Sequence, residues 1–536
     1  MDSNLSLTII MSGAFCSAEF ISEFGLIPPS FLPIGNTRLF VQQMKGFSSV
    51  AGKKVISLPE EFPVSDFDHS LIQDLGFEIA FLPSTLSLSG ALIKLIDLYG
   101  HKAKELRILH GDTLIRDLPI SNQNVISVST TNEYYMWGSV EVGDAGKIRI
   151  SNRRPSGMSD KVLAGYFSFS HIQDFRKYLS VADSFVGAVS SYFTAFQPQL
   201  KTTDHWLDFG HLHSYYKSKA RITTQRSFND LEISPRVVKK ESDDSQKMRA
   251  EANWYQSVPA DLRIFTPQFL GENSVGKSGY QIEYLYLSPI SDLYVFGKLP
   301  VFVWAGIFES CKEFFKMCAK HTSSSCKQIS DPETLFDKTK KRLTEFAKES
   351  GTDIYRTWIL NGRICPSLMQ IAEIVTKLVR SSSTGMSPIV HGDFCFSNIL
   401  YDFRVNSIKV IDPRGLDGAG NVSIYGDSQY DIAKLAHSVY GGYDYIIAGR
   451  YRMDIKNSYE LDFSIVWENG SEEIQDLFKS MVFGQKESYD LSIRAMVVHL
   501  FLSMLPLHKD RPDRQIAFIA NALRLYLEIE EEVGSL

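Results

Sequence analysis

The residues with the clearest chemical potential lie between positions 387 and 415, in SPIVHGDFCFSNILYDFRVNSIKVIDPRG. Asp393 and Asn398 follow an apolar run, and a second apolar run leads into Asp412. Transfer of a phosphoryl group from ATP needs a carboxylate that orients the attacking hydroxyl and accepts its proton. It also needs an amide and a second carboxylate that hold Mg²⁺ against the phosphates. Each residue alone is common as a turn, a cap or a strand end, but the three at this spacing predict an ATP-dependent phosphotransferase.

The order His-Gly-Asp-x-x-x-x-Asn, followed by Ile-Asp at a strand end, resembles the aminoglycoside phosphotransferase and choline kinase superfamily over residues of about 230–536. The resemblance implies an α+β, protein-kinase-like, two-lobed fold that uses ATP and Mg²⁺. It makes Asp393 the catalytic base, His391 an orienting residue of the catalytic loop, and Asn398 and Asp412 the Mg²⁺ ligands. The segment GDSQYDIAKLAHS predicts a helix with Asp431 near its start, where we expect it to support the structure.

The same resemblance suggests residues that contact ATP. RVVKKES looks like the strand that presents the ATP-anchoring lysine, and period-two alternation favours Lys240 over Lys239. SQKMRAEANWYQSVP looks like the helix that carries its partner carboxylate, Glu251. YQIEYLYLSP resembles the hinge that meets adenine, with Glu283 and Leu285 as candidates.

This chain departs from the family pattern at two places. Arg414 stands two positions after Asp412, where many relatives have a second acidic residue, and no glycine-rich loop precedes Lys240. Neither departure removes a group that the chemistry needs.

A second pattern, GENSVGKS at positions 271–278, matches the phosphate-binding P-loop at every position. A P-loop requires a helix directly after it, because the helix N-terminus binds the phosphates. Here GYQIEYLYL follows, which is a strand pattern. We therefore predict a hairpin turn in the kinase small lobe, with Lys277 exposed to solvent.

The first half of the chain alternates short apolar runs with amphipathic segments. LTIIMSG, LRILHGDTL and LAGYFSFS predict strands, and STLSLSGALIKLIDLYG predicts a helix. This alternation is typical of an α/β layer on a mostly parallel sheet. A shift in composition near positions 215–230 marks the junction, so we expect an α/β domain at 1–225, a β-rich small lobe at 226–290 and a helical large lobe at 291–536.

Four segments of the first half, PPSFLPIGNTRLFVQQM, LRILHGDTLIRDLP, KVLAGYFSFS and DHWLDFGHLHSYY, resemble the sugar-nucleotidyltransferase family. The resemblance implies a Rossmann-like domain that binds a nucleoside triphosphate (CTP, UTP or GTP), with Asp112 and Asp208 as ligands of a divalent ion. Gly13 stands alone where the family has a glycine-rich phosphate loop, and Ser30 replaces an expected lysine. Arg154 occupies the place of the lysine that holds the sugar phosphate, and its guanidinium could bind the phosphate as a fork.

Composition narrows the class of protein. The net charge of −6 and pI near 6.1 give no electrostatic reason to expect a nucleic-acid partner. The N-terminus lacks the features of a signal peptide, and no window approaches the length of a membrane span. The six cysteines are scattered, which favours reduced thiols in a cytoplasmic protein over disulfides or a zinc site. The oligomeric state stays open.

Three hypotheses follow. The first is a bifunctional enzyme: a kinase that phosphorylates a small hydroxylated molecule (a sugar, a polyol or a choline-like acceptor), joined to a nucleotidyltransferase that activates the product, as in the supply of capsule or lipopolysaccharide precursors. The second is a kinase whose first domain binds a ligand or regulates. The third is a non-enzymatic assembly protein, which the set Asp393, Asn398 and Asp412 disfavours.

Overall fold

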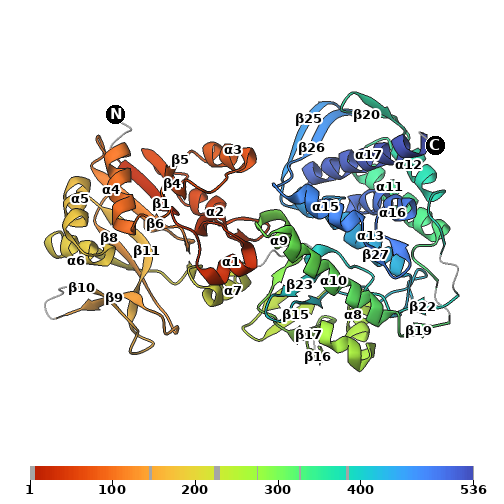
Figure 1. Cartoon of the computed structure of the whole chain (residues 1–536), viewed down its shortest axis with the longest axis horizontal. Helices are drawn as coiled ribbons and strands as arrows, with labels where there is room; N and C mark the ends of the chain where they lie inside the picture. The colour runs from red at the N-terminus through yellow and green to blue at the C-terminus, as the bar shows by residue number, and fades with distance from the viewer. Residues whose placement is uncertain are drawn as a thin grey trace. The chain divides into compact units, whose positions relative to one another are not determined.

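The computed structural model describes residues 6–143, 148–222, 230–273, 276–324, 327–381 and 385–534. The chain divides into two compact units, unit 1 at residues 1–222 and unit 2 at residues 223–536 (Figure 1). Over the described ranges, no helix combines the length and the apolar character that crossing a bilayer requires.

Unit 1 is built on a nine-stranded sheet. Its strands are β1 (Ser6–Met11), β4 (Lys53–Pro59), β5 (Glu78–Leu82), β6 (Glu105–His110), β8 (Val125–Thr130), β9 (Trp137–Val142), β10 (Ile148–Arg153), β11 (Lys161–Phe169) and β12 (Gln199–Thr202). β6, β1, β4 and β5 are adjacent in that order and parallel, so the apolar runs form the predicted α/β layer. Met11 lies opposite His110, which brings the loops after β1 and β6 to one edge of the sheet.

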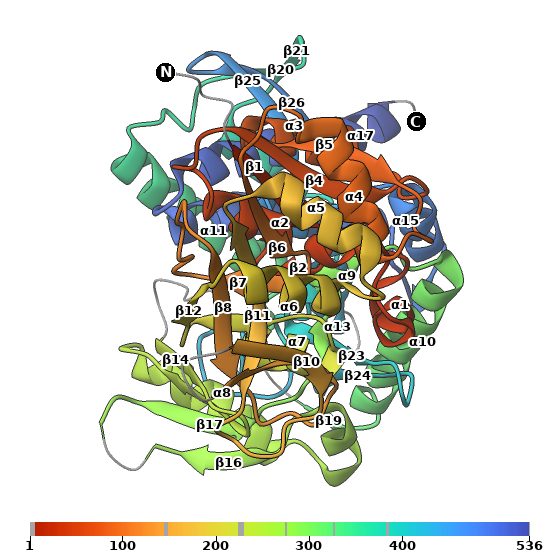
Figure 2. The ribbon, with the colours of Figure 1, turned by 90° about the vertical axis from the view of Figure 1, so that its left-hand side faces the viewer.

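Three helices, α4 (Leu88–Tyr99), α5 (Ile172–Val181) and α6 (Phe185–Ala195), cover one face of this sheet (Figure 2). Buried side chains such as Leu92 and Phe175 pack there against Leu7 and Ile9 of β1. The other helices are α1 (Ala18–Phe24), α2 (Leu39–Lys45), α3 (Asp66–Asp74) and α7 (Leu212–Ala220). Short strands complete the unit: β2 (Pro33–Ile34), β3 (Thr37–Arg38), and β7 (Thr113–Ile115) paired with β13 (Trp206–Asp208).

Unit 2 begins with an antiparallel sheet in the order β14 (Asp230–Ile233), β15 (Val237–Glu241), β17 (Gly279–Glu283) and β16 (Phe269–Glu272). Helix α8 (Ser245–Ser257) packs on it. The P-loop-like segment is the turn of the β16–β17 hairpin, and β17 begins directly after Ser278, as the strand pattern predicts; positions 274 and 275 lie outside the described residues. Lys277 is half exposed and lies 3.4 Å from Asp243.

The rest of unit 2 is mainly helical. Its helices are α9 (Ile290–Phe296), α10 (Val301–Cys318), α11 (Pro332–Ser350), α12 (Leu368–Thr376), α13 (Ser428–Val439), α14 (Tyr443–Ile447), α15 (Ser471–Lys479), α16 (Leu491–Ser503) and α17 (Pro512–Gly534). The almost fully buried α16 packs against α11, α12, α13 and α17 (Figure 1).

Strands in this part are short. They are β18 (Ser288–Pro289), β19 (Thr322–Ser323), β20 (Trp358–Leu360), β21 (Arg363–Cys365), β22 (Ser387–Pro388), β23 (Ile399–Asp402), β24 (Ser407–Val410), β25 (Tyr451–Asn457), β26 (Glu460–Ile465), β27 (Val482–Phe483) and β28 (Lys486–Glu487). The β23–β24 hairpin connects the two halves of the phosphotransferase motif, because Ile399 pairs with Val410. The five described cysteines are buried free thiols, as expected, and Cys326 lies outside the described residues.

Candidate active sites

The loop between β22 and β23 brings Asp393 and Asn398 together. The Asn398 amide donates to the Asp393 carboxylate over 3.1 Å and to the Asp393 carbonyl over 3.0 Å. The other Asp393 oxygen, Oδ1, lies 2.8 Å from Nζ of Lys434 on α13. The Asp393 side chain keeps 38% of its surface exposed, so it is held in place and still accessible from solvent.

His391 packs within the loop itself, where its ring forms hydrogen bonds with Ile411 and Asp393. It is fully buried, and burial lowers its pKa to about 4, so the ring is neutral. Its Nε2 lies 3.0 Å from the Ile411 carbonyl, which can only accept, so Nε2 carries the proton and Nδ1 accepts from the Asp393 amide. The Asp431 carboxylate accepts hydrogen bonds from the backbone amides of His391 and Gly392, each over 2.7 Å. His391 is therefore placed to orient Asp393, and Asp431 to hold the loop.

Lys240 is the buried lysine of β15, and Lys239 pairs with Glu241 at the surface. Nζ of Lys240 lies 2.7 Å from Glu251 on α8 and 3.0 Å from Oδ1 of Asp412. Burial lowers the pKa of Lys240, but Asp412 and Glu251 outweigh it and raise the pKa. Burial raises the pKa of Glu251, which Lys240 only partly offsets.

Asp412 lies two residues after the end of β24, with the left-handed φ of 57° that few non-glycine residues adopt. The Asp412 amide donates a hydrogen bond to the Tyr255 hydroxyl over 3.2 Å, and the Asp412 side chain is 43% exposed. Asp412 thus contacts Lys240, whereas Asn398 contacts Asp393. Their carboxylate and amide oxygens are ligands of the kind that Mg²⁺ prefers, so the two residues fit the expected ion.

The adenine candidates lie where the small sheet ends. Glu283 is the exposed last residue of β17, opposite Val237, and its amide donates to the Gln268 carbonyl. Leu285 is partly buried in the segment that connects β17 to β18. Glu283 thus ends a strand and Leu285 lies in the connection after it, and among the described residues no hydrogen bond or ion pair joins either one to Lys240 or Glu251.

In unit 1, Asp112 and Asp208 converge. Asp112 follows β6, and Asp208 ends β13, which pairs with β7; the Phe209 amide donates to the Asp112 carbonyl over 2.8 Å. A Cβ added to Gly210 would lie 2.8 Å from Oδ2 of Asp112 and 3.4 Å from Oδ1 of Asp208. The two carboxylates therefore face the same small space, which only a glycine leaves open.

The electrostatics of this pair suit a divalent ion. Burial and the Asp208 charge raise the pKa of Asp112 to about 6. The pKa of His211 is also raised, chiefly by its hydrogen bond to Asp208. Across the described part of the chain, no group of three or more His, Cys, Asp or Glu side chains could hold a metal alone. Two carboxylates plus the oxygens of a bound triphosphate would complete such a site, so the residues fit the ion that the resemblance implies.

The loop after β1 is packed rather than open. The Ser30 amide donates to the Ser12 hydroxyl over 3.0 Å, and the Ser30 hydroxyl donates to the Gly111 carbonyl over 3.2 Å. A Cβ on Gly13 would touch Ser57, 3.3 Å from its Oγ. Ser30, which replaces the expected lysine, therefore ties the loops after β1 and β6 together as a fully buried residue.

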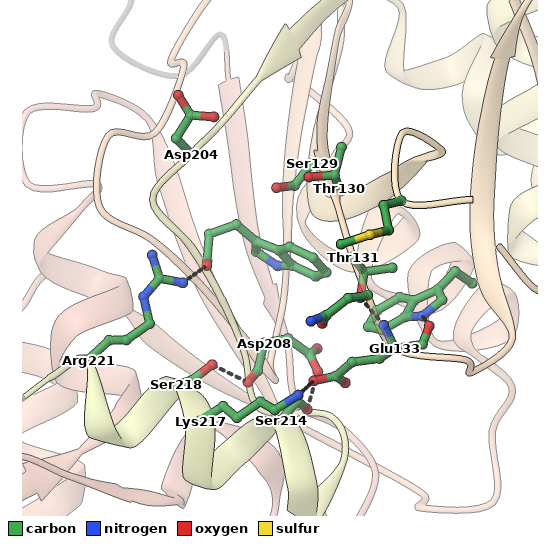
Figure 3. Close-up of a pocket in the computed structure, with 14 residues that line it drawn as sticks. Ser129, Thr130, Thr131, Glu133, Asp204, Asp208, Ser214, Lys217, Ser218 and Arg221 are labelled. Atoms are coloured by element: carbon green, nitrogen blue, oxygen red, sulfur yellow. Dashed lines mark hydrogen bonds and ion pairs between the residues drawn. The ribbon is translucent and has the colours of Figure 1, made fainter. Parts of the chain in front are cut away.

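A cavity of about 410 Å³ opens beside Asp208 (Figure 3). Its walls come from β8 and the segment after it, from Trp137 and Trp206, and from α7. Glu133 and Lys217 form an ion pair of 3.0 Å across it. The lining residues are Ser129, Thr130, Thr131, Asn132, Glu133, Trp137, Met158, Asp204, Trp206, Asp208, Ser214, Lys217, Ser218 and Arg221.

Arg154 is not part of this cavity wall. It is exposed just after β10, and its guanidinium lies over the Tyr134 ring at 5.2 Å. The structure thus brings Asp112 and Asp208 together, leaves Gly13 in a packed loop, and places Arg154 outside the set.

Sequence reasoning missed two basic residues of the unit 2 site. These are Lys434 and Lys338, the latter on α11 with its Nζ 3.2 Å from the Tyr430 hydroxyl. A signal for Lys434 existed, because it lies three residues after Asp431 and so on the same helix face. The approach of α11 to Tyr430 had none, since it depends on how helices pack.

Comparison with protein-family models and with curated proteins finds no match. Solved structures are similar over the N-terminal part. The nucleoside-diphosphate-sugar pyrophosphorylase from Vibrio cholerae RC9 is 13% identical with a TM-score of 0.33, covering 40% of this chain and 99% of that one. HddC from Yersinia pseudotuberculosis is 18% identical with a TM-score of 0.31 (41% and 100%), and the inositol-1-phosphate CTP transferase from T. maritima is 14% identical with a TM-score of 0.30 (41% and 96%).

Proposed function

We propose that unit 2 is an ATP-dependent kinase for a hydroxyl group of a small molecule. The observation that carries this proposal is that hydrogen bonds of His391 with Ile411 and Arg414 join the loop of Asp393 to the segment of Asp412, which pairs with Lys240. Asp393 itself is accessible and is held by Asn398 and Lys434. A base for the acceptor, an anchor for the phosphates and candidate Mg²⁺ ligands are the groups that phosphoryl transfer requires.

In this proposal the acceptor oxygen attacks the γ-phosphorus of ATP. The bond from that phosphorus to the β–γ bridging oxygen breaks, ADP leaves, and the hydroxyl proton passes to Asp393. Lys240, kept charged by Glu251 and Asp412, neutralises phosphate oxygens. Asn398 and Asp412 would hold Mg²⁺, which supplies charge neutralisation for the transferred group.

We further propose that unit 1 transfers a nucleotidyl group from a nucleoside triphosphate to a phosphate ester. A phosphate oxygen of the ester attacks the α-phosphorus, and pyrophosphate leaves. Asp112 and Asp208 would hold the divalent ion, and the cavity beside Asp208 has a size typical of small-molecule sites. With both units active, the chain would make a nucleotide-activated precursor, of the kind that capsule or surface-glycan synthesis consumes.

The test uses the full-length protein with Mg²⁺. ATP, CTP, GTP and UTP are each paired with candidate phosphate esters, and pyrophosphate is measured; ATP with unphosphorylated acceptors is followed by ADP release. Asp393→Asn should abolish only ADP formation, and Asp112→Asn only pyrophosphate formation. Kinase turnover that survives Asp393→Asn at a near wild-type rate would refute the assignment of the base.

A second candidate is that only unit 2 is catalytic and unit 1 binds a ligand or regulates. The packed loop around Gly13 and Ser30 favours it, because Ser30 stands in the place of the expected lysine and is hydrogen-bonded to Ser12 and Gly111. ATP-dependent phosphorylation without pyrophosphate from any nucleotide and ester pair would support this candidate over the bifunctional enzyme.

A further inference from the structure

Three cations from segments that are distant in the sequence lie around Tyr430 and the loop that carries Asp393. We name Lys338, Arg414 and Lys434 the cation cluster. Lys338 on α11 donates to the Tyr430 hydroxyl, and Lys434 on α13 pairs with Asp393. Arg414 lies two residues after Asp412, and its stem packs over Gly392, because a Cβ added there would lie 2.7 Å from Cβ of Arg414.

The cluster carries more positive than negative charge. Lys434 has Asp393 as its partner, but within the described ranges no carboxylate forms an ion pair with Lys338 or Arg414. Tyr430 is buried and offers Lys338 only a hydroxyl. Partly buried cations without a counter-charge cost free energy, which an anion bound among them would recover.

The pKa shifts agree with this surplus. Burial lowers the pKa of Lys338; Tyr430 partly offsets this shift, whereas the charges of Arg414 and Lys434 add to it. Burial alone would raise the pKa of Tyr430, yet Lys338, Lys434 and Arg414 together lower it to about 8. All three cations therefore act on one point, the Tyr430 hydroxyl.

The cluster lies on the acceptor's side of the site. Among the described residues, the ion pair of the cluster is that of Lys434 with Asp393, the group that must contact the attacking hydroxyl, whereas Lys240 pairs with Asp412 and Glu251. A cation held next to the base can reach a second group on the molecule that presents its hydroxyl there.

We propose that the acceptor of unit 2 carries an anionic group of its own, a carboxylate or a phosphate ester, which Lys338, Arg414 and Lys434 bind. This inference rests on the kinase activity proposed above. The anionic group takes no part in bond making: the acceptor's free hydroxyl forms the new bond to the γ-phosphorus, its proton passes to Asp393, and ADP leaves. Sugar acids and sugar phosphates have this chemistry.

The experiment measures ADP release by the full-length protein with matched acceptors. Each neutral pentose or hexose is paired with its aldonic acid, its uronic acid and its phosphate ester, so that each pair differs in charge but little in shape. We expect the anionic members to be used with kcat/KM at least about tenfold higher, as for one charge-assisted hydrogen bond. Equal or better use of the neutral members overturns the inference and leaves the kinase proposal intact.

Binding without ATP gives a readout that does not depend on turnover. Calorimetric titration with the same panel should detect the anionic members, and Lys338→Met should weaken their binding about tenfold or more. Lys340→Met, which removes an exposed lysine of the same helix, is the matched control and should change nothing. Anion binding without turnover of any acceptor would support the anion site while refuting the kinase; no preference for the anionic members in either assay refutes the site.

The variants also show whether the cation cluster binds the acceptor or ATP. Lys338→Met should raise the KM of the anionic acceptor and leave the KM of ATP nearly unchanged, and Lys338→Arg should restore much of the loss. A raised KM for ATP with an unchanged acceptor KM would mean that the cluster serves the nucleotide, which contradicts the inference.

Discussion

Replacing Lys240 by Met tests the buried ion pair of unit 2 as a question of stability, independent of any substrate. The substitution keeps most of the side-chain volume but removes the ammonium that lies 2.7 Å from Glu251. Glu251 is 2% exposed and would retain only the Tyr280 hydroxyl, at 2.8 Å, as a close partner, with Lys247 at 3.9 Å. A buried carboxylate is thereby left without its counter-charge.

The expected cost is about 3 kcal/mol of the free energy of unfolding at pH 7, near the lower end for breaking a buried pair. The lower end applies because Glu251 can bind a proton, and because the second contact of Lys240, with the half-exposed Asp412, contributes little. For a unit that spans residues 223–536 the melting temperature should fall by about 5 °C.

The loss should depend on pH in a definite direction. Burial already raises the pKa of Glu251, and removal of Lys240 raises it further. Between the unfolded and the folded pKa the native state binds more protons, so stability falls as pH rises through that window. Lys240→Met should therefore lose less stability at pH 5 than at pH 8.

The assay is calorimetric unfolding of the full chain, in which each unit can give its own transition. The Lys240→Met, Glu251→Gln double variant should recover most of the loss, because the amide oxygen still accepts from Tyr280 and no charge is left unpaired. Both variants should lack kinase activity. A single variant as stable as wild type at pH 5 and pH 8, or a double variant no better than the single one, would refute the reasoning.

Three other substitutions test separate features. In metal-free protein, Asp112→Asn should stabilise unit 1 at pH 7 by about 1–2 kcal/mol, because the raised pKa of Asp112, about 6, means that its ionised form is disfavoured beside Asp208. The gain should disappear below about pH 4, where the carboxyl is protonated in both states. Urea unfolding at both pH values checks this, and an unchanged stability at pH 7 contradicts it. Gly392→Ala should cost about 1–3 kcal/mol and lower kinase kcat, since φ is 78° and the new Cβ would meet Arg414; wild-type kinetics would exclude the strain. Ser87→Ala should cost about 1 kcal/mol by removing the cap of α4, without changing kinase activity, as thermal unfolding and ADP release will show.

Local patterns were sufficient for the elements that carry the candidate residues. Apolar runs and their spacing predicted β1, β6, α4 and the β16–β17 hairpin, since they report which face of an element is buried. Alternation in β15 also selected Lys240 over Lys239, and the structure buries Lys240. These are properties of a few adjacent residues, so they can be read without knowing what packs against them.

What the sequence determined by itself was the set of reactive groups and their local settings: Asp393 and Asn398 in one loop, Asp412 at a strand end, and Asp112 after a parallel strand. Only the tertiary structure decided which groups meet. Pairing of β7 with β13 joins Asp208 to Asp112, and packing of the helices brings Lys338 of α11 to Tyr430 and Lys434 of α13 to Asp393. Such contacts depend on sheet order and helix packing, which are set by the summed burial of many side chains rather than by any neighbouring residue.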